Sequence, residues 1–201
     1  LGRAPLAAQP TVAIVGARNA SAAGRKLARD IAAGLGEAGF VTVSGLALGI
    51  DGEAHAATLR TGTIAVLGGA IDHIYPPQHE RLYAEIAADG LIVSESPFGY
   101  RAKAQDFPRR NRIITGLSRG VVVVEAAERS GSLISARMAG EQGREVMAVP
   151  GSPLDPRAAG TNALIYQGAS LVRHATDVLE ILSSLSHGQV SAPLAGAYDP
   201  E

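Results

Sequence analysis

Short runs of apolar residues recur along the chain, with longer segments between them. Polar and apolar residues do not alternate within these runs, and such runs are typical of strands buried on both faces in a parallel sheet. Parallel neighbours need a crossover between them, usually a helix. Strands are expected at Val12–Val15, Phe40–Val43, Thr63–Leu67, Leu91–Val93, Val121–Val124 and Val146–Val149.

The intervening segments have helical spacing. Leu27, Ile31 and Leu35 recur at i, i+4 and i+8 and form one apolar face, as a helix covering a sheet requires. Further helices are expected around residues 54–59, 82–87, 133–142 and 176–185. Alternating strands and helices predict an α/β domain, Rossmann-like and doubly wound, with a mostly parallel sheet flanked by helices on both faces. This domain is expected to span residues 1–185. Residues 186–201 are rich in Gly, Ser, Pro and Ala, and are expected to be a linker or disordered tail.

Composition limits the function classes. The chain has 201 residues, 46% of them hydrophobic, and a formal net charge of −1. It has no cysteine, which excludes disulfides and thiolate metal sites and favours a cytoplasmic location. No apolar run approaches the roughly 20 residues of a membrane span, so no membrane partner is expected. A net charge this close to zero argues against binding of a polyanion by the overall charge of the protein, so nucleic-acid binding requires a localised basic patch.

One segment provides such a patch. Phe107-Pro-Arg-Arg-Asn-Arg112 places an aromatic ring and three arginines within six residues. An anionic ligand is expected, with Phe107 stacking on a base and Arg110 and Arg112 reaching phosphates. The alternative is that the arginines form a solvated helix face and that Phe107 only packs ahead of Pro108.

Small residues follow most of the predicted strands. Ligands of open parallel sheets bind beyond the carboxyl ends of the strands, where small residues let backbone amides approach a phosphate. Each turn taken alone is also explained as a tight connection between a strand and a helix. The candidate positions are Gly16, Ala17, Arg18, Ser21, Ser44, Gly45, Ser130, Gly131 and Ser132.

The first turn argues against a dinucleotide cofactor. It reads Gly16-x-Arg18-x-x-Ser21, with arginine at the position where a dinucleotide fingerprint needs its second glycine. A guanidinium there fills the space of the cofactor and offers a fork to a single phosphate. A Walker-type P-loop is also absent from the sequence, and no cofactor is expected.

Asp51 and His55 stand four residues apart on a predicted helix and share a face. A carboxylate orienting an imidazole is half of an acid/base relay, but Asp51 also suits a helix start, and His55 is then a residue lining the pocket. His73 and His79 lack companions at metal spacing, so no catalytic residue and no metal site is assigned.

Taken together, these segments closely resemble the DNA-processing protein A (DprA/Smf) family over roughly residues 12–182. The matching segments are Val12-Ala-Ile-Val-Gly-Ala-Arg18, Ser44-Gly-Leu-Ala-Leu-Gly-Ile-Asp-Gly-Glu-Ala-His55, Ala65-Val-Leu-Gly68 with Tyr75-Pro76, the block from Phe107 to Ser118, Ser130-Gly-Ser132, Val149-Pro-Gly-Ser152 and Gly160-Thr-Asn-Ala-Leu-Ile165.

The resemblance implies a Rossmann-like domain that binds single-stranded DNA in a positive pocket, forms a homodimer and helps to load the RecA recombinase during natural transformation. It carries binding roles to Arg18, Phe107, Arg110, Asn111 and Arg112. Family members often have a lysine just before the phenylalanine, and Lys103 is the nearest candidate here.

The expected activity is therefore binding and not catalysis. Arg18→Ala or Arg110→Ala should weaken single-strand binding and flatten its salt dependence while leaving the fold intact. The alternatives are a nucleotide-processing, phosphoribohydrolase-like enzyme and a nucleotide-sensing module. The first alternative is disfavoured because the segment from Glu125 to Ser135 lacks the second glycine pair and the spaced glutamate of those enzymes.

Overall fold

A parallel sheet forms the centre of the protein. The computed structural model describes residues 1–186, and in this range seven strands pair in the order β4-β3-β2-β1-β5-β6-β7. Every pair of neighbouring strands is parallel. The strands are β1 (Thr11–Val15), β2 (Val41–Ser44), β3 (Thr63–Val66), β4 (Leu91–Val93), β5 (Gly120–Val123), β6 (Glu145–Ala148) and β7 (Ser170–Leu171).

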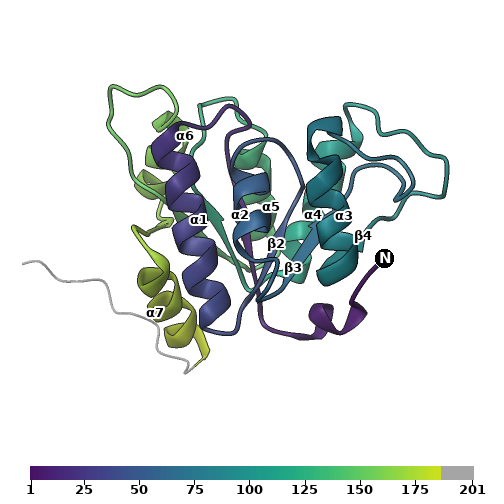
Figure 1. The fold of residues 1–201 in the computed structure, drawn as a ribbon. Coiled ribbons are helices and arrows are strands. Elements are labelled where there is room, and N and C mark those ends of the chain that lie inside the picture. Colours follow the sequence, from purple (N-terminus) through teal and green to yellow (C-terminus); the bar gives the residue numbers. More distant parts are fainter. Residues whose placement is uncertain (187–201) are drawn as a thin grey trace, which may run out of the picture.

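Helices cover both faces of the sheet, as expected (Figure 1). One face carries α1 (Ala22–Glu37), α2 (Ile50–Ala57), α3 (Glu80–Asp89) and α7 (Ala175–Ser186). The other face carries α4 (Asp106–Leu117), α5 (Ser132–Glu141) and α6 (Ala159–Tyr166). Two 3-10 turns, η1 (Ala4–Ala8) and η2 (Pro77–His79), precede β1 and α3. The chain winds outward from β1 to β4, returns through α4 to β5, and winds outward again, so the strand order reverses between β1 and β5.

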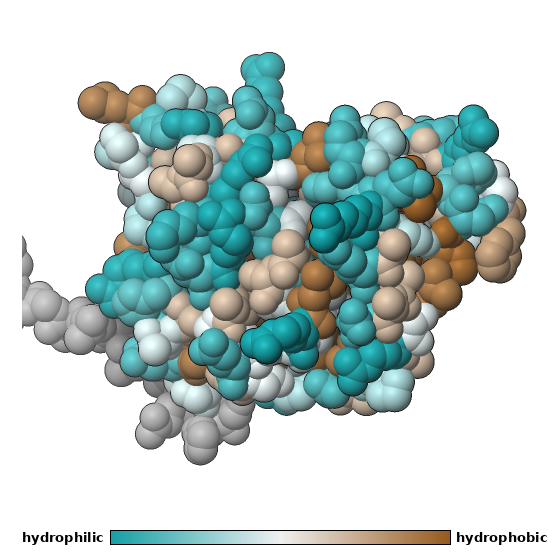
Figure 2. All heavy atoms as spheres, in the orientation of Figure 1, coloured by the Kyte–Doolittle hydropathy of each residue, from teal (hydrophilic) through white to brown (hydrophobic). Residues whose placement is uncertain are grey.

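The alternation of side chains along each strand explains the continuous apolar runs. In β1, Val12 and Ile14 pack with α1, whereas Ala13 and Val15 join the cluster under α4 and α5. Both sets are buried, so both faces of the strand require apolar residues. The outer surfaces of α1 and α3 are mainly hydrophilic, and hydrophobic residues are visible between the helices and at the right-hand edge of the view (Figure 2).

The structure confirms the predicted α/β class. It also confirms the six predicted strands, each end lying within one residue of the prediction. It adds α4, α6 and β7, which are not among the expected elements. β7 is only two residues long, and the buried residues of α6 are Gly160 and Thr161, so neither element shows the spacing of buried apolar residues that marks the predicted elements. α7 ends at Ser186, one residue beyond the expected end of the domain at residue 185. Residues 187–201 lie outside the described residues. No helix within residues 1–186 has the length and apolarity needed to cross a membrane.

Candidate nucleic-acid interface

Two adjoining cavities lie at the carboxyl ends of the strands. These strand ends are at the top of the molecule in Figure 1. The smaller has a volume of about 400 Å³ and the larger about 680 Å³. The loops after β1, β2 and β3 and the first turns of α4 line them, and the larger cavity extends to the N-terminus of α5. Arg18, Ala47, Phe107 and Arg110 line both cavities, so these residues form the wall between them.

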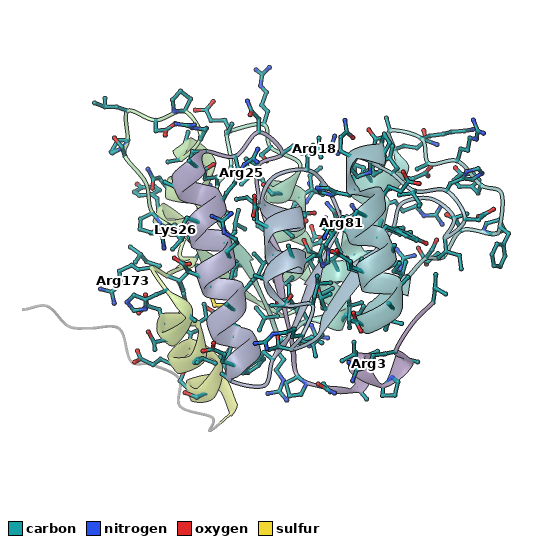
Figure 3. All side chains as sticks on the ribbon, viewed as in Figure 1. Arg3, Arg18, Arg25, Lys26, Arg81 and Arg173 are labelled. Atoms are coloured by element: carbon teal, nitrogen blue, oxygen red, sulfur yellow. The ribbon has the colours of Figure 1, made fainter. Side chains whose placement is uncertain are left out.

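Arg18 and Phe107 are in contact in this wall. The guanidinium carbon of Arg18 lies 5.7 Å from the centre of the Phe107 ring, within the range of a cation–π interaction. The Tyr75 ring lies on the same phenylalanine, with 5.3 Å between ring centres and an angle of 39°. Gly68 lies beneath it, where a Cβ atom would stand 3.1 Å from the ring. Arg18 is exposed at the upper rim of the molecule (Figure 3). The wall thus presents an exposed cation beside aromatic rings.

Arg110 is placed differently from the phosphate contact expected of it. Its side chain turns into the sheet, and the residue is 7% exposed. One guanidinium nitrogen donates hydrogen bonds to the carbonyl oxygens of Gly45, at 2.9 Å, and Val66, and Nε donates to Oδ1 of Asn111 at 3.3 Å. Burial lowers the pKa of Arg110 to about 10, opposed by the nearby Asp51, so the side chain remains charged at neutral pH.

The other basic residues of the segment do not join this wall. Arg112 forms an ion pair with Glu95 on a neighbouring loop and lines neither cavity. Residues two apart on a helix project about 200° apart, so Arg110 and Arg112 point to nearly opposite sides of α4. Lys103 is exposed outside both cavities, and its backbone N–H donates to Asp106 at 2.8 Å in the turn before α4. The basic segment is therefore not one cationic surface.

Ser21 is engaged within the protein. Its backbone N–H and its hydroxyl donate to the two carboxylate oxygens of Glu125 at 2.9 and 2.5 Å, and its hydroxyl oxygen accepts from the N–H of Gly24 at 2.9 Å. Ser21 is thus the N-cap of α1, and Glu125 places a negative charge where the helix dipole favours one. This is the position at which a Rossmann fold holds a cofactor phosphate. The side chain of Glu125 occupies it here.

Ser44 also has a structural role. Its hydroxyl donates to the carbonyl of Ile14 at 2.6 Å, the residue is buried, and it lines neither cavity. Gly45 lines the smaller cavity, but its N–H donates to Asp51 at 3.1 Å and its carbonyl accepts from Arg110.

The remaining sequence candidates do meet in the larger cavity. Ser130, Gly131 and Ser132 line it at the start of α5, where the two serine hydroxyls share a hydrogen bond of 2.7 Å. The space beside Gly131 is open, with no atom within 4 Å of an added Cβ. The same cavity is lined by Gly16, Ala17 and Arg18 from the loop after β1 and by Asn111 from α4.

Asp51 and His55 form no relay, and the expectation that His55 lines the pocket is wrong. Asp51 accepts from the backbone N–H groups of Gly45 and Ala47, and burial raises its pKa against the lowering effect of Arg110. His55 is fully buried and shares a hydrogen bond of 2.7 Å with Thr63. Burial lowers the pKa of His55 to about 3. The two side chains share a face of α2 but are bonded to different partners, and His55 reaches neither cavity.

The two loop histidines also differ. His73 lines the smaller cavity, whereas the ring of His79 packs against Gly52 and lies 3.0 Å from the carbonyl oxygen of Leu46. Within residues 1–186 there is no group of three or more His, Asp or Glu side chains placed to hold a metal ion.

Sequence reasoning missed three arginines of the site. Arg101 lines the smaller cavity, and Arg129 and Arg157 line the larger. Arg157 is paired with Asp155. Each stands alone in a loop at the carboxyl side of the sheet, so a search for dense basic runs does not find it. Surveying every cation in those loops would have done so.

The fold and the site together define the class of protein. The protein is a doubly wound Rossmann-like domain with a cationic, aromatic cleft at the ends of its strands and a glutamate at its first helix N-terminus. The model of the family described as DNA recombination-mediator protein A matches residues 1–183, and the chain belongs to this family.

Named relatives agree with this assignment. Protein Smf of Escherichia coli is 47% identical over 193 residues, which are 94% of this chain and 52% of that protein. The X-ray structure of DNA processing protein A from Streptococcus pneumoniae superposes with a TM-score of 0.85 at 46% identity, covering 89% of this chain and 64% of that one. A structure concerning the single-stranded DNA binding mode of DNA processing protein A from Helicobacter pylori gives 0.84 at 31% identity, covering 93% and 85%. The chain thus spans about half the length of the Escherichia coli relative.

Proposed function

We propose that this domain binds single-stranded DNA across the two cavities and takes part in DNA recombination and natural transformation through binding. The observation that carries the proposal is the stack of Arg18 on Phe107 between the cavities. Aromatic rings stack on any base, and a neighbouring guanidinium binds phosphate, which is the usual pairing in single-strand binders.

The charges of the site support a polyanionic ligand. Arg101 and Arg129 are exposed beside the cavities, and no ion pair or hydrogen bond of either guanidinium is found within residues 1–186. Arg18 likewise has no carboxylate partner in this range. In a chain of net charge −1, unpaired arginines gathered at one edge of a sheet form a local positive field. Binding should depend little on base sequence, because stacking and phosphate contacts tolerate every base.

The proposal extends to the partners. The family description is that of a recombination mediator, and a mediator assists a recombinase, so we include loading of a RecA-type recombinase, action as a homodimer and a cytoplasmic location. Catalysis is not part of it. Both carboxylate oxygens of Glu125, the acidic residue that follows the central strand β5, accept hydrogen bonds from Ser21, which argues against a free catalytic carboxylate.

Fluorescence anisotropy of a labelled oligo-dT tests the proposal. Arg18→Gln should weaken binding about tenfold, since hydrogen bonds to charged groups contribute about 1.5–3 kcal/mol. The slope of log affinity against log salt should fall by about 0.7, the value for one single-strand phosphate contact. Arg81→Gln is the matched control, because Arg81 lies on α3, pairs with Glu85 and lines neither cavity. Equal affinity and slope for the wild type and Arg18→Gln would overturn the assignment.

A further inference from the structure

We propose that Arg110 is a positioning residue: together with Asp51 it fixes the loop after β2, and this loop sets the backbone from which Arg18 projects. The inference rests on the proposed function. It replaces a direct phosphate contact by Arg110, which its place in a basic segment suggests.

Arg110 and Asp51 hold the same loop from opposite sides. The guanidinium of Arg110 bridges the ends of two strands, donating to the carbonyl oxygens of Gly45 and Val66. The carboxylate of Asp51 accepts from the N–H groups of Gly45, at 3.1 Å, and Ala47, at 3.3 Å. Gly45 therefore has both its backbone polar groups bound to buried side chains. A Cβ atom on Gly45 would lie 2.6 Å from the guanidinium, so the arginine packs directly on the backbone.

The loop needs such restraints because it contains a strained residue. Leu46 has a φ of 59°, in the left-handed region that side chains with a Cβ rarely adopt. Its side chain is fully buried among apolar residues, and its carbonyl oxygen lies 3.0 Å from Nδ1 of His79. A backbone in such a conformation persists only where its surroundings determine it. Arg110, Asp51 and His79 are those surroundings.

The other end of the loop rests on the Arg18 turn. At Gly49, where φ is 78°, a Cβ atom would lie 2.3 Å from the carbonyl oxygen of Ala17 and 2.5 Å from that of Arg18. The N–H of Ile50 donates to the carbonyl of Ala17 at 3.3 Å. The two loops are thus in backbone contact, and a shift of one displaces the other. Arg110 acts on Arg18 through this contact.

The buried position of Arg110 agrees with this role. Its Nη1 and Nε donate to two carbonyl oxygens and to Asn111 inside the protein, whereas Arg18 is exposed beside the same cavities. A phosphate contact through Nη1 or Nε would require breaking the bonds that hold the loop, which leaves only Nη2 of a residue that is 7% exposed.

Asp51→Ala tests the inference, because two explanations predict opposite signs. If the charges of the site act directly on DNA, removing a carboxylate should raise affinity for oligo-dT. If Asp51 and Arg110 position Arg18, affinity should fall about tenfold, as expected for a misaligned charge-assisted contact. Arg110→Lys adds a second case: a direct phosphate contact survives as a lysine contact, whereas the single ammonium group of lysine cannot replace the bonds of Nη1 to two carbonyl oxygens and the bond of Nε to Asn111 together. Binding is measured well below the thermal midpoint of each variant.

A double-mutant cycle separates positioning from a general structural defect. In an Arg18→Gln background, Asp51→Ala should change the affinity less than twofold, because its effect passes through Arg18. Arg110→Lys supplies the same cycle if Asp51→Ala does not fold. A gain of affinity in Asp51→Ala, or losses that multiply in the double variant, would overturn the inference. Failure of the proposed function looks different, because the wild type would then not bind or Arg18→Gln would have no effect.

Discussion

Ser21→Ala distinguishes a helix cap from a phosphate contact. The sequence places Ser21 in the glycine-rich turn as a candidate DNA contact, but in the structure its hydroxyl connects Gly24 to Glu125. Alanine removes the acceptor for the first turn of α1 and the hydroxyl donor to the carboxylate. It leaves the backbone N–H bond from residue 21 to Glu125 in place. The variant should therefore lose stability and keep its DNA affinity.

The size of the loss follows from these two contacts. An N-cap serine contributes about 1 kcal/mol. The hydroxyl bond to a carboxylate contributes about 1.5–3 kcal/mol when buried, and less at this half-buried site. A total of about 2–3 kcal/mol corresponds to a fall in Tm of about 5–10 °C, since a domain of this size shifts by about 2–4 °C per kcal/mol.

Thermal unfolding followed by circular dichroism measures the first effect, and anisotropy with labelled oligo-dT measures the second. Ser130→Ala is the matched control, because Ser130 also lies beside a helix start but shares its hydrogen bond only with Ser132. It should leave Tm nearly unchanged. A Tm of Ser21→Ala within 2 °C of wild type, with affinity reduced tenfold, would show that Ser21 contacts DNA and that the cap contributes little.

Three further predictions follow from the packing. Burial lowers the pKa of His55 from 6.5 to about 3, so the unfolded chain binds a proton below pH 6.5 that the folded protein excludes. Its contribution to stability is complete above pH 6.5 and is lost as the pH falls toward 3, by up to about 1.4 kcal/mol per pH unit. In urea unfolding, His55→Asn should have a shallower pH dependence than wild type between pH 7 and 4, and equal slopes would refute the assignment. Gly24→Ala should destabilise the protein by about 1–3 kcal/mol, because the added Cβ would lie 2.4 Å from the carboxyl carbon of Glu125. Gly140→Ala has open space around the added Cβ and should stabilise the protein by about 0.5–1 kcal/mol in the same thermal unfolding assay. Phe107→Leu should weaken oligo-dT binding about tenfold with the salt slope unchanged, as loss of one stacked base predicts, and a changed slope with normal affinity would contradict the stacking role.

Most of the fold was predictable because apolar spacing reports burial directly. The run from Val121 to Val124 has no polar position, and a strand enclosed between two helical layers requires this. The α6 helix was not predicted, for the opposite reason. Its buried residues are Gly160 and Thr161. The backbone of Gly160 packs so closely on the loop after β5 that an added Cβ would lie 2.7 Å from the carbonyl oxygen of Ala126. Close backbone packing of this kind leaves no hydrophobic signal at the buried positions.

The site was only partly predictable, because residue type does not specify the direction of a side chain. Arg18, Phe107 and the turn at Ser130 meet at the cavities as expected. Arg110 has the same charge as Arg18 but is directed into the sheet. Arg112 is directed to a surface glutamate. These directions depend on how α4 is rotated about its axis and on the carbonyl groups at the strand ends that accept from Arg110. The charge of a residue in the sequence indicates neither.

The interior placement of two charged side chains favours a polymeric ligand over a mononucleotide. Glu125 occupies the N-terminus of α1, and Arg110 occupies the ends of β2 and β3, so protein groups fill the deep positions where a Rossmann fold holds a cofactor phosphate. The exposed cations lie farther out, at Arg18 between the two cavities and at Arg101 and Arg129 beside each of them. A DNA strand that runs from one cavity to the other past Phe107 contacts all of these arginines. A single nucleotide contacts only the arginines of the cavity that it occupies. Affinity should therefore rise steeply with oligonucleotide length until both cavities are spanned, and a titration of oligo-dT length against free nucleotide measures that rise.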